Sequence, residues 1–168
     1  DNTILILYSD HGQKWTTTDK LPLIIHFPGD QHAGIVNVNT QNIDIAPTIL
    51  DYLGIDKPEW MDGSSLLGNL DPKRLIIAAG TNKVENIDGY NILPPDKIKP
   101  PFYQFSNLFV TQCKNWYNID LEDDMSVKQG EVKNYVNSCS ADMMDSQEVI
   151  QGKIGEFLKQ LGYLLPES

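Results

Sequence analysis

The sequence predicts an α/β fold that is followed by a smaller α+β part. Three observations support this class. Two apolar segments of strand length lie at residues 4–8 and 23–27, an amphipathic helical pattern follows them, and a proline-rich span then separates these elements from an alternating pattern and a final helix. The 168 residues are 40% hydrophobic, which is sufficient for a core of ordinary size. We therefore expect two parts, residues 1–80 and 81–168.

The two apolar segments are expected to be neighbouring or near-neighbouring parallel strands of one buried sheet. Residues 4–8 are apolar without interruption, and residues 23–27 are nearly so and end at Pro28 and Gly29. Unbroken apolar strands are typical of a parallel sheet that is covered on both faces. A third, shorter strand is expected at residues 35–41.

A helix is expected over residues 42–56. Asn42 or Asp44 can cap its start, and Pro47 suits its first turn because the first helical N–H groups have no partner within the helix. Gly54 is a reasonable end, since glycine readily adopts the left-handed conformation of a helix terminus.

The second part is expected to be a small antiparallel sheet with a C-terminal helix. Residues 81–106 look loop-like, because four prolines lie in "ILPPDKIKPP". Residues 107–121 and 131–139 alternate apolar and polar positions, as an antiparallel ribbon does. Apolar residues at three-to-four spacing then predict an amphipathic helix that begins near Asp145.

The net charge and the two cysteines limit which binding partners and which kinds of metal site are expected. The formal net charge of −10 argues against binding to nucleic acid or anionic lipid by general electrostatics. No apolar run approaches the length that spans a membrane. Cys113 and Cys139 match no zinc-site spacing, so they form either one disulfide in an exported protein or two buried thiols.

Asp10 and His11 follow the first predicted strand directly. Gly12 permits a sharp turn there, and ligands of open α/β sheets bind outside the carboxyl ends of strands. A carboxylate with a neutral imidazole suits zinc, manganese or calcium. The alternative is that Asp10 caps the next segment and His11 makes an ordinary hydrogen bond.

Four blocks of the sequence, in this order and spacing, resemble the C-terminal part of the catalytic domain of sulfatases, in the alkaline phosphatase superfamily. The blocks are "DNTILILYSDHG", "KLPLIIHFPGD", "VNVNTQNIDIAPTILDYLGID" and "MDGSSLLG". The resemblance implies the C-terminal portion of an alkaline-phosphatase-like α/β/α sandwich with a mostly parallel sheet. Beyond Arg74 only a loose likeness to the small C-terminal subdomain of that family is found.

The resemblance also implies roles for individual residues. Asp10 and His11 correspond to the late pair of metal ligands, with calcium as the foremost ion and manganese or zinc as alternatives. Lys14 corresponds to a cationic catalytic residue that faces the sulfate oxygens, and its alternative is a solvated lysine. His26 is expected to be a packed strand-end histidine, and Asp44 a contact at the start of the helix.

The nucleophile of such an enzyme and its early pair of acidic ligands are not found in the sequence. Neither cysteine lies in a Cys/Ser-x-Pro-x-Arg motif. We expect an exported sulfate-ester hydrolase whose N-terminal half, on the same polypeptide, completes the site, and we expect the fragment alone to be inactive. A phosphate-ester-cleaving relative, such as a phosphodiesterase or phosphoglycerol transferase, and a non-catalytic binding or structural domain on the same scaffold are the alternatives.

Overall fold

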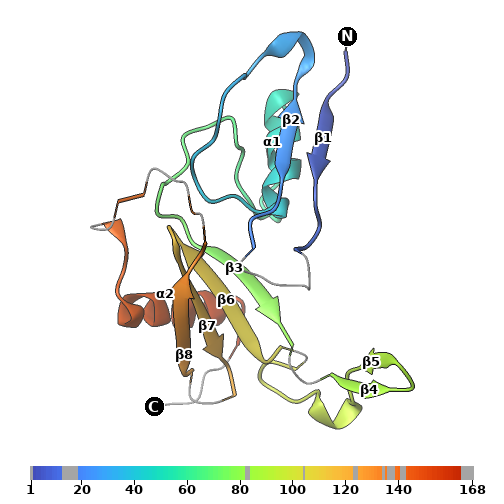
Figure 1. Ribbon diagram of the computed structural model, residues 1–168, viewed down its shortest axis with the longest axis vertical. Coiled ribbons are helices and arrows are strands. Elements are labelled where there is room, and N and C mark those ends of the chain that lie inside the picture. The colour runs from blue at the N-terminus through green and yellow to red at the C-terminus, as the bar shows by residue number, and fades with distance from the viewer. Residues whose placement is uncertain are drawn as a thin grey trace.

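The computed structural model shows two units, which are formed by consecutive parts of the chain (Figure 1). The first unit consists of strands β1 and β2 with helix α1, and the second consists of a four-stranded sheet with helix α2. A small hairpin, β4 and β5, projects from the second unit. The residues described are 2–12, 19–81, 84–103, 105–122, 125–133, 135, 139–140 and 143–163.

The first unit contains an antiparallel strand pair. Strands β1 (Leu5–Tyr8) and β2 (Leu23–His26) pair so that Leu5 lies opposite His26 and Tyr8 lies opposite Leu23. The expected parallel pairing of these two strands is therefore wrong. An unbroken apolar run indicates a strand that can be covered on both faces, but it does not fix the direction of the neighbouring strand. Residues 35–41, expected as a third strand, form no strand.

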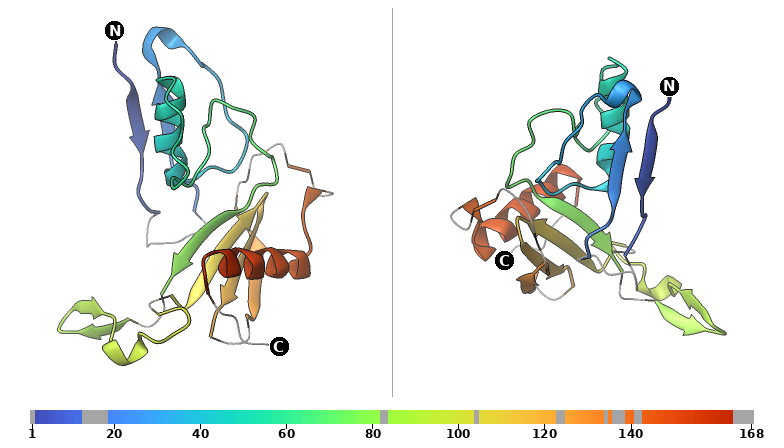
Figure 2. Two further views of the ribbon diagram at one scale, coloured as in Figure 1. Left: turned by 180° about the vertical axis from the view of Figure 1, so that it is seen from behind. Right: turned by 45° about the horizontal axis from the view of Figure 1, so that its top comes forward.

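Helix α1 lies along β2 and covers one face of this pair (Figure 2). A short 3-10 turn, Asn42–Asp44, leads into α1 (Ile45–Tyr52), as the capping pattern predicts. Gly54 follows the helix with a φ of 67°. The Phe27 ring packs on Tyr52 with centroids 4.8 Å apart, which ties the end of β2 to the helix.

The opposite face of the strand pair is apolar and exposed. Leu7 pairs with Ile24, and Leu5 lies two residues along β1, so all three side chains share one face. Their relative exposures are 65% for Leu5, 59% for Leu7 and 60% for Ile24. Within the described residues, this face therefore has no complete cover.

The second unit confirms the predicted antiparallel sheet and C-terminal helix. Its strands run in the order β3-β6-β7-β8, with every neighbouring pair antiparallel. Helix α2 covers one face, and the core between sheet and helix consists of Phe102, Leu108, Val110, Tyr117, Ile119, Leu121, Ile150, Ile154 and Leu158. The strands are β3 (Ile76–Gly80), β6 (Asn107–Gln112), β7 (Asn115–Asp120) and β8 (Val127–Glu131), and the helix is α2 (Gln147–Gln160).

Two details of the second unit differ from expectation. Among the described residues the last strand is β8, which overlaps the expected stretch at residues 131–139 only at Glu131, and residues 134 and 136–138 of that stretch lie outside the described residues. The region expected to be loop-like contains the hairpin of β4 (Glu85–Ile87) and β5 (Tyr90–Ile92). Its turn residues, Asp88 and Gly89, both have positive φ, as the two-residue hairpin turn requires.

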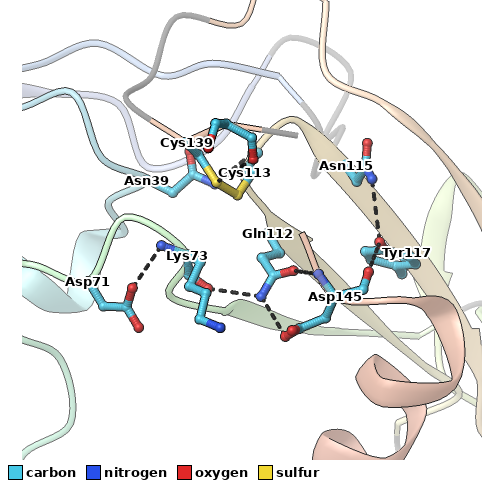
Figure 3. The surroundings of a disulfide bond; sticks show 10 residues. Asn39, Asp71, Lys73, Gln112, Cys113, Asn115, Tyr117, Cys139 and Asp145 are labelled. Atoms are coloured by element: carbon cyan, nitrogen blue, oxygen red, sulfur yellow. Dashed lines mark hydrogen bonds between the residues drawn. A yellow bond between two sulfur atoms is a disulfide. The ribbon is translucent and has the colours of Figure 1, made fainter. Parts of the chain in front are cut away.

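A disulfide and a buried polar network stabilise one end of the second sheet (Figure 3). Cys113 and Cys139 form the disulfide, which settles the open alternative for the two cysteines. The side chain of Gln112 is fully buried, donates to the carbonyl of Lys73 at 3.0 Å and accepts from the backbone N–H of Asp145 at 2.8 Å. The Asn39 amide donates to the carbonyl of Cys113 at 2.9 Å, so this end also contacts the first unit.

Candidate active site

Asp10 and His11 lie just past the end of β1, separated from Tyr8 only by Ser9, where the chain turns. The backbone here accepts hydrogen bonds from the segment that leads into α1. The Asn42 amide donates to the carbonyls of Ser9 and Asp10, at 3.3 Å and 3.4 Å. The start of the helix thus fixes the position of the strand end.

The side chains of Asp10 and His11 face one another. Asp10 Oδ1 lies 3.8 Å from His11 Nε2 and accepts the backbone N–H of His11 at 3.1 Å. The Asp10 side chain is 79% exposed and the His11 side chain 40% exposed. The two groups therefore converge at a point that solvent reaches.

The hydrogen bond of His11 selects its tautomer. Nδ1 lies 2.9 Å from the carbonyl oxygen of Gly12. A carbonyl oxygen only accepts, so Nδ1 carries the proton in the neutral ring and Nε2 keeps its lone pair. A backbone carbonyl that orients a histidine in this way is the usual outer partner of a metal-binding imidazole.

The pair fits part of a metal site. Two donors 3.8 Å apart can both lie at the usual ligand distances, about 2.0–2.6 Å, from one ion. Two side chains are fewer ligands than a stable site needs. Within the described residues there is no group of three or more His, Cys, Asp or Glu side chains that could hold an ion. Lys14, the expected catalytic cation, lies outside the described residues.

His11 opens onto a cleft of about 820 Å³ between the two units. The first unit contributes residues at the end of β1 and before β2, and the second unit contributes residues of β7, β8 and the segment after β8. The described lining residues are Ser9, His11, Gly12, Asp19, Lys20, Leu21, Pro22, Trp116, Glu131, Val132 and Lys133.

A charged side chain links the two units beside this cleft, and an ion pair lies within the second unit. The Lys20 ammonium lies 5.9 Å from the ring centroid of Tyr135, a cation–π contact across the two units. Glu131 forms an ion pair with Lys114 at 2.7 Å. The cleft wall thus combines acidic and basic side chains with one large aromatic ring.

The other two histidines of the sequence, His26 and His32, have structural surroundings. His26 lies 3.8 Å from the Asp30 carboxylate, and the His32 ring packs edge-on against Phe27 at 5.4 Å between centroids. Neither histidine lines the cleft. His26 thus has the strand-end surroundings expected of it.

Asp44 is a buried structural group whose partner was not predicted. Its carboxylate accepts the N–H groups of Gln41 and Ser64 as well as the Arg74 guanidinium. The contact to Gln41 is the expected one at the helix start. No spacing marks Arg74, which is 30 residues away in the chain, although a buried carboxylate requires a cation or several donors.

Comparison with known proteins points to one family. Residues 8–89, which include Asp10 and His11, match the family described as "N-sulphoglucosamine sulphohydrolase, C-terminal". In the part of the chain that is described, no helix is long and apolar enough to cross a membrane.

Three similar proteins illustrate the range of relatives. The chain is 35% identical over 80 residues, 40% of its length, to "Extracellular sulfatase SULF-1 homolog" of Drosophila melanogaster. It is 29% identical over 125 residues, 63% of its length, to "Ulvan-active sulfatase" of Formosa agariphila. It is 40% identical over 72 residues, 37% of its length, to a "2,3-bisphosphoglycerate-independent phosphoglycerate mutase" of Rippkaea orientalis.

The chain corresponds to a small share of each relative. The matched regions span 7% of the Drosophila protein, 24% of the Formosa protein and 13% of the Rippkaea protein. The family match, the similar sulfatases and the antiparallel sheet with its C-terminal helix agree with one another. Together they support identifying the chain as a fragment similar to the C-terminal part of sulfatase-family proteins.

Proposed function

We propose that the protein carrying this chain is a metal-dependent hydrolase of sulfate esters, in which Asp10 and His11 are two of the metal ligands. The observation that supports this most directly is the geometry of the pair. A carboxylate oxygen and the unprotonated nitrogen of an oriented imidazole converge at the end of β1, inside the region that matches the sulfatase family.

Each group of the chain has a defined task in this proposal. The Gly12 carbonyl holds His11 in the tautomer that presents Nε2, and the Asn42 amide holds the backbone of Asp10 in place. A divalent ion, when bound, would neutralise an ester oxygen and lower the energy of the charged transition state. Lys14, three residues after His11, would offset charge on the other sulfate oxygens. We propose calcium as the ion, with manganese and zinc as the alternatives.

The site needs a partner segment, and we propose that it is the N-terminal half of the same polypeptide. Two ligands do not make a stable site, so further ligands and the nucleophile have to come from elsewhere. The exposed face of Leu5, Leu7 and Ile24 offers an apolar surface on which such a segment can pack. The chain alone should therefore lack activity.

Hydrolysis of phosphate esters is the second candidate. The similarity to a phosphoglycerate mutase favours it, because that relative's name describes chemistry on a phosphate group. Sulfate and phosphate esters present similar tetrahedral oxygen groups to a metal ion, so the described residues serve either reaction. A non-catalytic binding domain is the third candidate.

We also propose that the protein is exported. Disulfides form and persist in oxidising compartments, and Cys113 and Cys139 are joined. The name of the Drosophila relative describes an extracellular protein, which agrees with this proposal.

The decisive experiment measures hydrolysis of an aryl sulfate and an aryl phosphate by the full-length protein. The protein is stripped with a chelator and then supplied with calcium, manganese or zinc. Asp10→Asn and His11→Ala are each expected to reduce activity by at least 100-fold and to weaken metal binding, measured separately by calorimetry.

Matched controls come from the second His–Asp pair of the chain. Asp30→Asn and His26→Ala alter residues of the same types, outside the cleft, and should leave both activity and metal affinity unchanged. Full activity and full metal affinity in both Asp10→Asn and His11→Ala would refute the ligand assignment. Faster turnover of the phosphate would select the second candidate, and turnover of neither ester, in protein that is folded and loaded, would select the third.

A further inference from the structure

Trp116 forms part of the cleft wall, although it belongs to the second unit. On β7 its neighbours Tyr117 and Ile119 alternate with it, and both of these are buried in the core against α2. Because successive side chains of a strand point to opposite faces, Trp116 lies on the face away from α2. Its side chain is partly exposed and lines the same cleft as His11.

The position of the Trp116 ring is fixed by a glycine on the neighbouring strand. Gly130 of β8 lies directly opposite Trp116 in the register. A Cβ atom at Gly130 would fall 2.5 Å from Cζ2 and 2.9 Å from Nε1 of Trp116. The indole therefore lies across the backbone of β8 at a place where only glycine leaves room for it.

The polar groups near this ring indicate what kind of ligand it would meet. Lys20 and Lys133 are exposed and supply donors, whereas Asp19 and Glu131 supply acceptors. The two ammonium groups and the two carboxylates offset one another, so the wall offers donors and acceptors without a net attraction for a bare anion. A ring that carries several hydroxyl groups can use donors and acceptors together, and its apolar face can stack on an indole.

We propose that Trp116 and Lys133 are specificity-determining residues that hold the non-reacting part of the substrate, a saccharide ring with an anionic substituent. The indole is the platform for the ring, and the Lys133 ammonium contacts the anionic group. This assignment rests on the proposed function, because it places the ester to be cleaved on the His11 side of the same cleft.

The test measures binding by calorimetry with the full-length protein in the Asp10→Asn background, in which turnover is expected to be at least 100-fold slower. The probes are a panel of sulfated mono- and disaccharides with glucosamine, galactose and rhamnose rings, their unsulfated counterparts, and inorganic sulfate. Trp116→Ala is expected to weaken binding of the preferred sulfated sugar by at least tenfold, while Trp116→Phe keeps it within about threefold. Lys133→Gln should weaken binding of the sulfated sugar and leave binding of its unsulfated counterpart unchanged.

Gly130→Ala tests the platform without altering the tryptophan itself. The added methyl group displaces the ring, so binding should fall about as far as in Trp116→Ala. Trp60→Ala and Lys128→Gln are the matched controls, because both side chains are exposed and neither lines the cleft. Both controls should bind like the parent variant, and thermal melting checks that every variant is folded.

Kinetics in the otherwise unaltered protein provide a second readout. Trp116→Phe and Lys133→Gln should raise KM for the preferred sulfated sugar more than they lower kcat. Equal affinities for inorganic sulfate and for sulfated sugars, or unchanged binding in Trp116→Ala, Gly130→Ala and Lys133→Gln, would overturn the assignment. If no ester is hydrolysed but Trp116-dependent sugar binding persists, the proposed function and the substrate-specificity role fail together, whereas saccharide binding at Trp116 is retained.

Discussion

Arg74 clamps Asp44 with two parallel hydrogen bonds, from Nη1 to Oδ2 and from Nη2 to Oδ1, each 2.9 Å long. The Asp44 side chain is completely buried and the Arg74 side chain is 13% exposed. Two backbone N–H groups, of Gln41 and Ser64, complete the coordination of the carboxylate. One side chain thus joins the start of α1 to two later segments of the chain.

Removing either partner of this buried pair should destabilise the protein strongly. We expect Arg74→Ala to lower the free energy of unfolding by about 3–5 kcal/mol, because it leaves a buried carboxylate without its cation. Urea denaturation measures the change. Lys159→Ala is the control, since it breaks only an exposed pair with Glu156 and should cost about 0–1 kcal/mol. Equal effects of the two substitutions would contradict the role of the buried pair.

Gly63 should tolerate no side chain. Its φ is 85°, and a Cβ atom there would lie 2.3 Å from the carbonyl oxygen of Ile43, in the turn that leads to Asp44. Gly63→Ala therefore adds a backbone clash to the conformational strain of about 1–2 kcal/mol. Gly54→Ala should cost only the conformational strain of a positive φ, because nothing lies near its Cβ position. Thermal melting should show the larger loss at Gly63, and a smaller loss there than at Gly54 would refute the clash.

The disulfide should contribute substantially to stability. Cys113 and Cys139 are 26 residues apart, and closing such a loop in the unfolded chain is worth about 3–4 kcal/mol in the chain-entropy model. The double variant Cys113→Ser with Cys139→Ser should lose this amount in urea denaturation. Adding a reductant to the unaltered protein should give a similar loss and should leave the double variant unaffected.

Asp145 should make stability depend on pH in the acid range. Hydrogen bonds from Lys153 and Gln112 lower the pKa of this carboxyl below its ordinary value, although partial burial opposes them. The unfolded chain then binds a proton more readily than the folded chain. The ionised Asp145 carboxylate therefore raises the free energy of unfolding. This stabilisation is present above the ordinary pKa of about 3.9 and is lost as pH falls through the lower pKa of the folded state.

Urea denaturation between about pH 5 and pH 2 measures this dependence. Asp145→Asn should remove the share of the pH-dependent loss of stability that comes from this carboxyl. The free energy of unfolding should therefore change less between these pH values than in the unaltered protein. Asp30→Asn is the control, because the Asp30 carboxylate is 91% exposed and lies far from α2 in sequence. If Asp145→Asn follows the same acid curve as the unaltered protein, the carboxyl does not carry the effect.

Local patterns in the sequence were sufficient to predict the helices and the strands β6 and β7. Pro47 and Asp44 mark the start of α1, and Ser146, which caps α2, lies one residue from the predicted start at Asp145. Such signals act over three or four residues, so they are readable without tertiary contacts. The Asp88-Gly89 turn carries a hairpin signal of the same kind, within the region that its prolines mark as loop-like.

Relationships between distant segments could not be read in this way. The antiparallel direction of β1 and β2, the pairing of β3 with β6 and the clamp of Arg74 on Asp44 all depend on how segments meet in space. For the site, the Asp10-His11 dipeptide was visible because both residues directly follow an apolar strand. The place of Trp116 in the cleft wall could not be predicted from the sequence, because no local pattern links Trp116 to His11, which lies more than a hundred positions earlier.

The two-stranded arrangement of β1 and β2 leaves each strand with a hydrogen-bonding partner on one side only, within the described residues. An unprotected strand edge beside an exposed apolar face is a template for pairing with other chains. Produced by itself at high concentration, this polypeptide should therefore form oligomers through β1 or β2, visible as a concentration-dependent mass in analytical ultracentrifugation. Lysine in place of Leu7 would put a charge on that face and should keep the isolated chain monomeric to higher concentration.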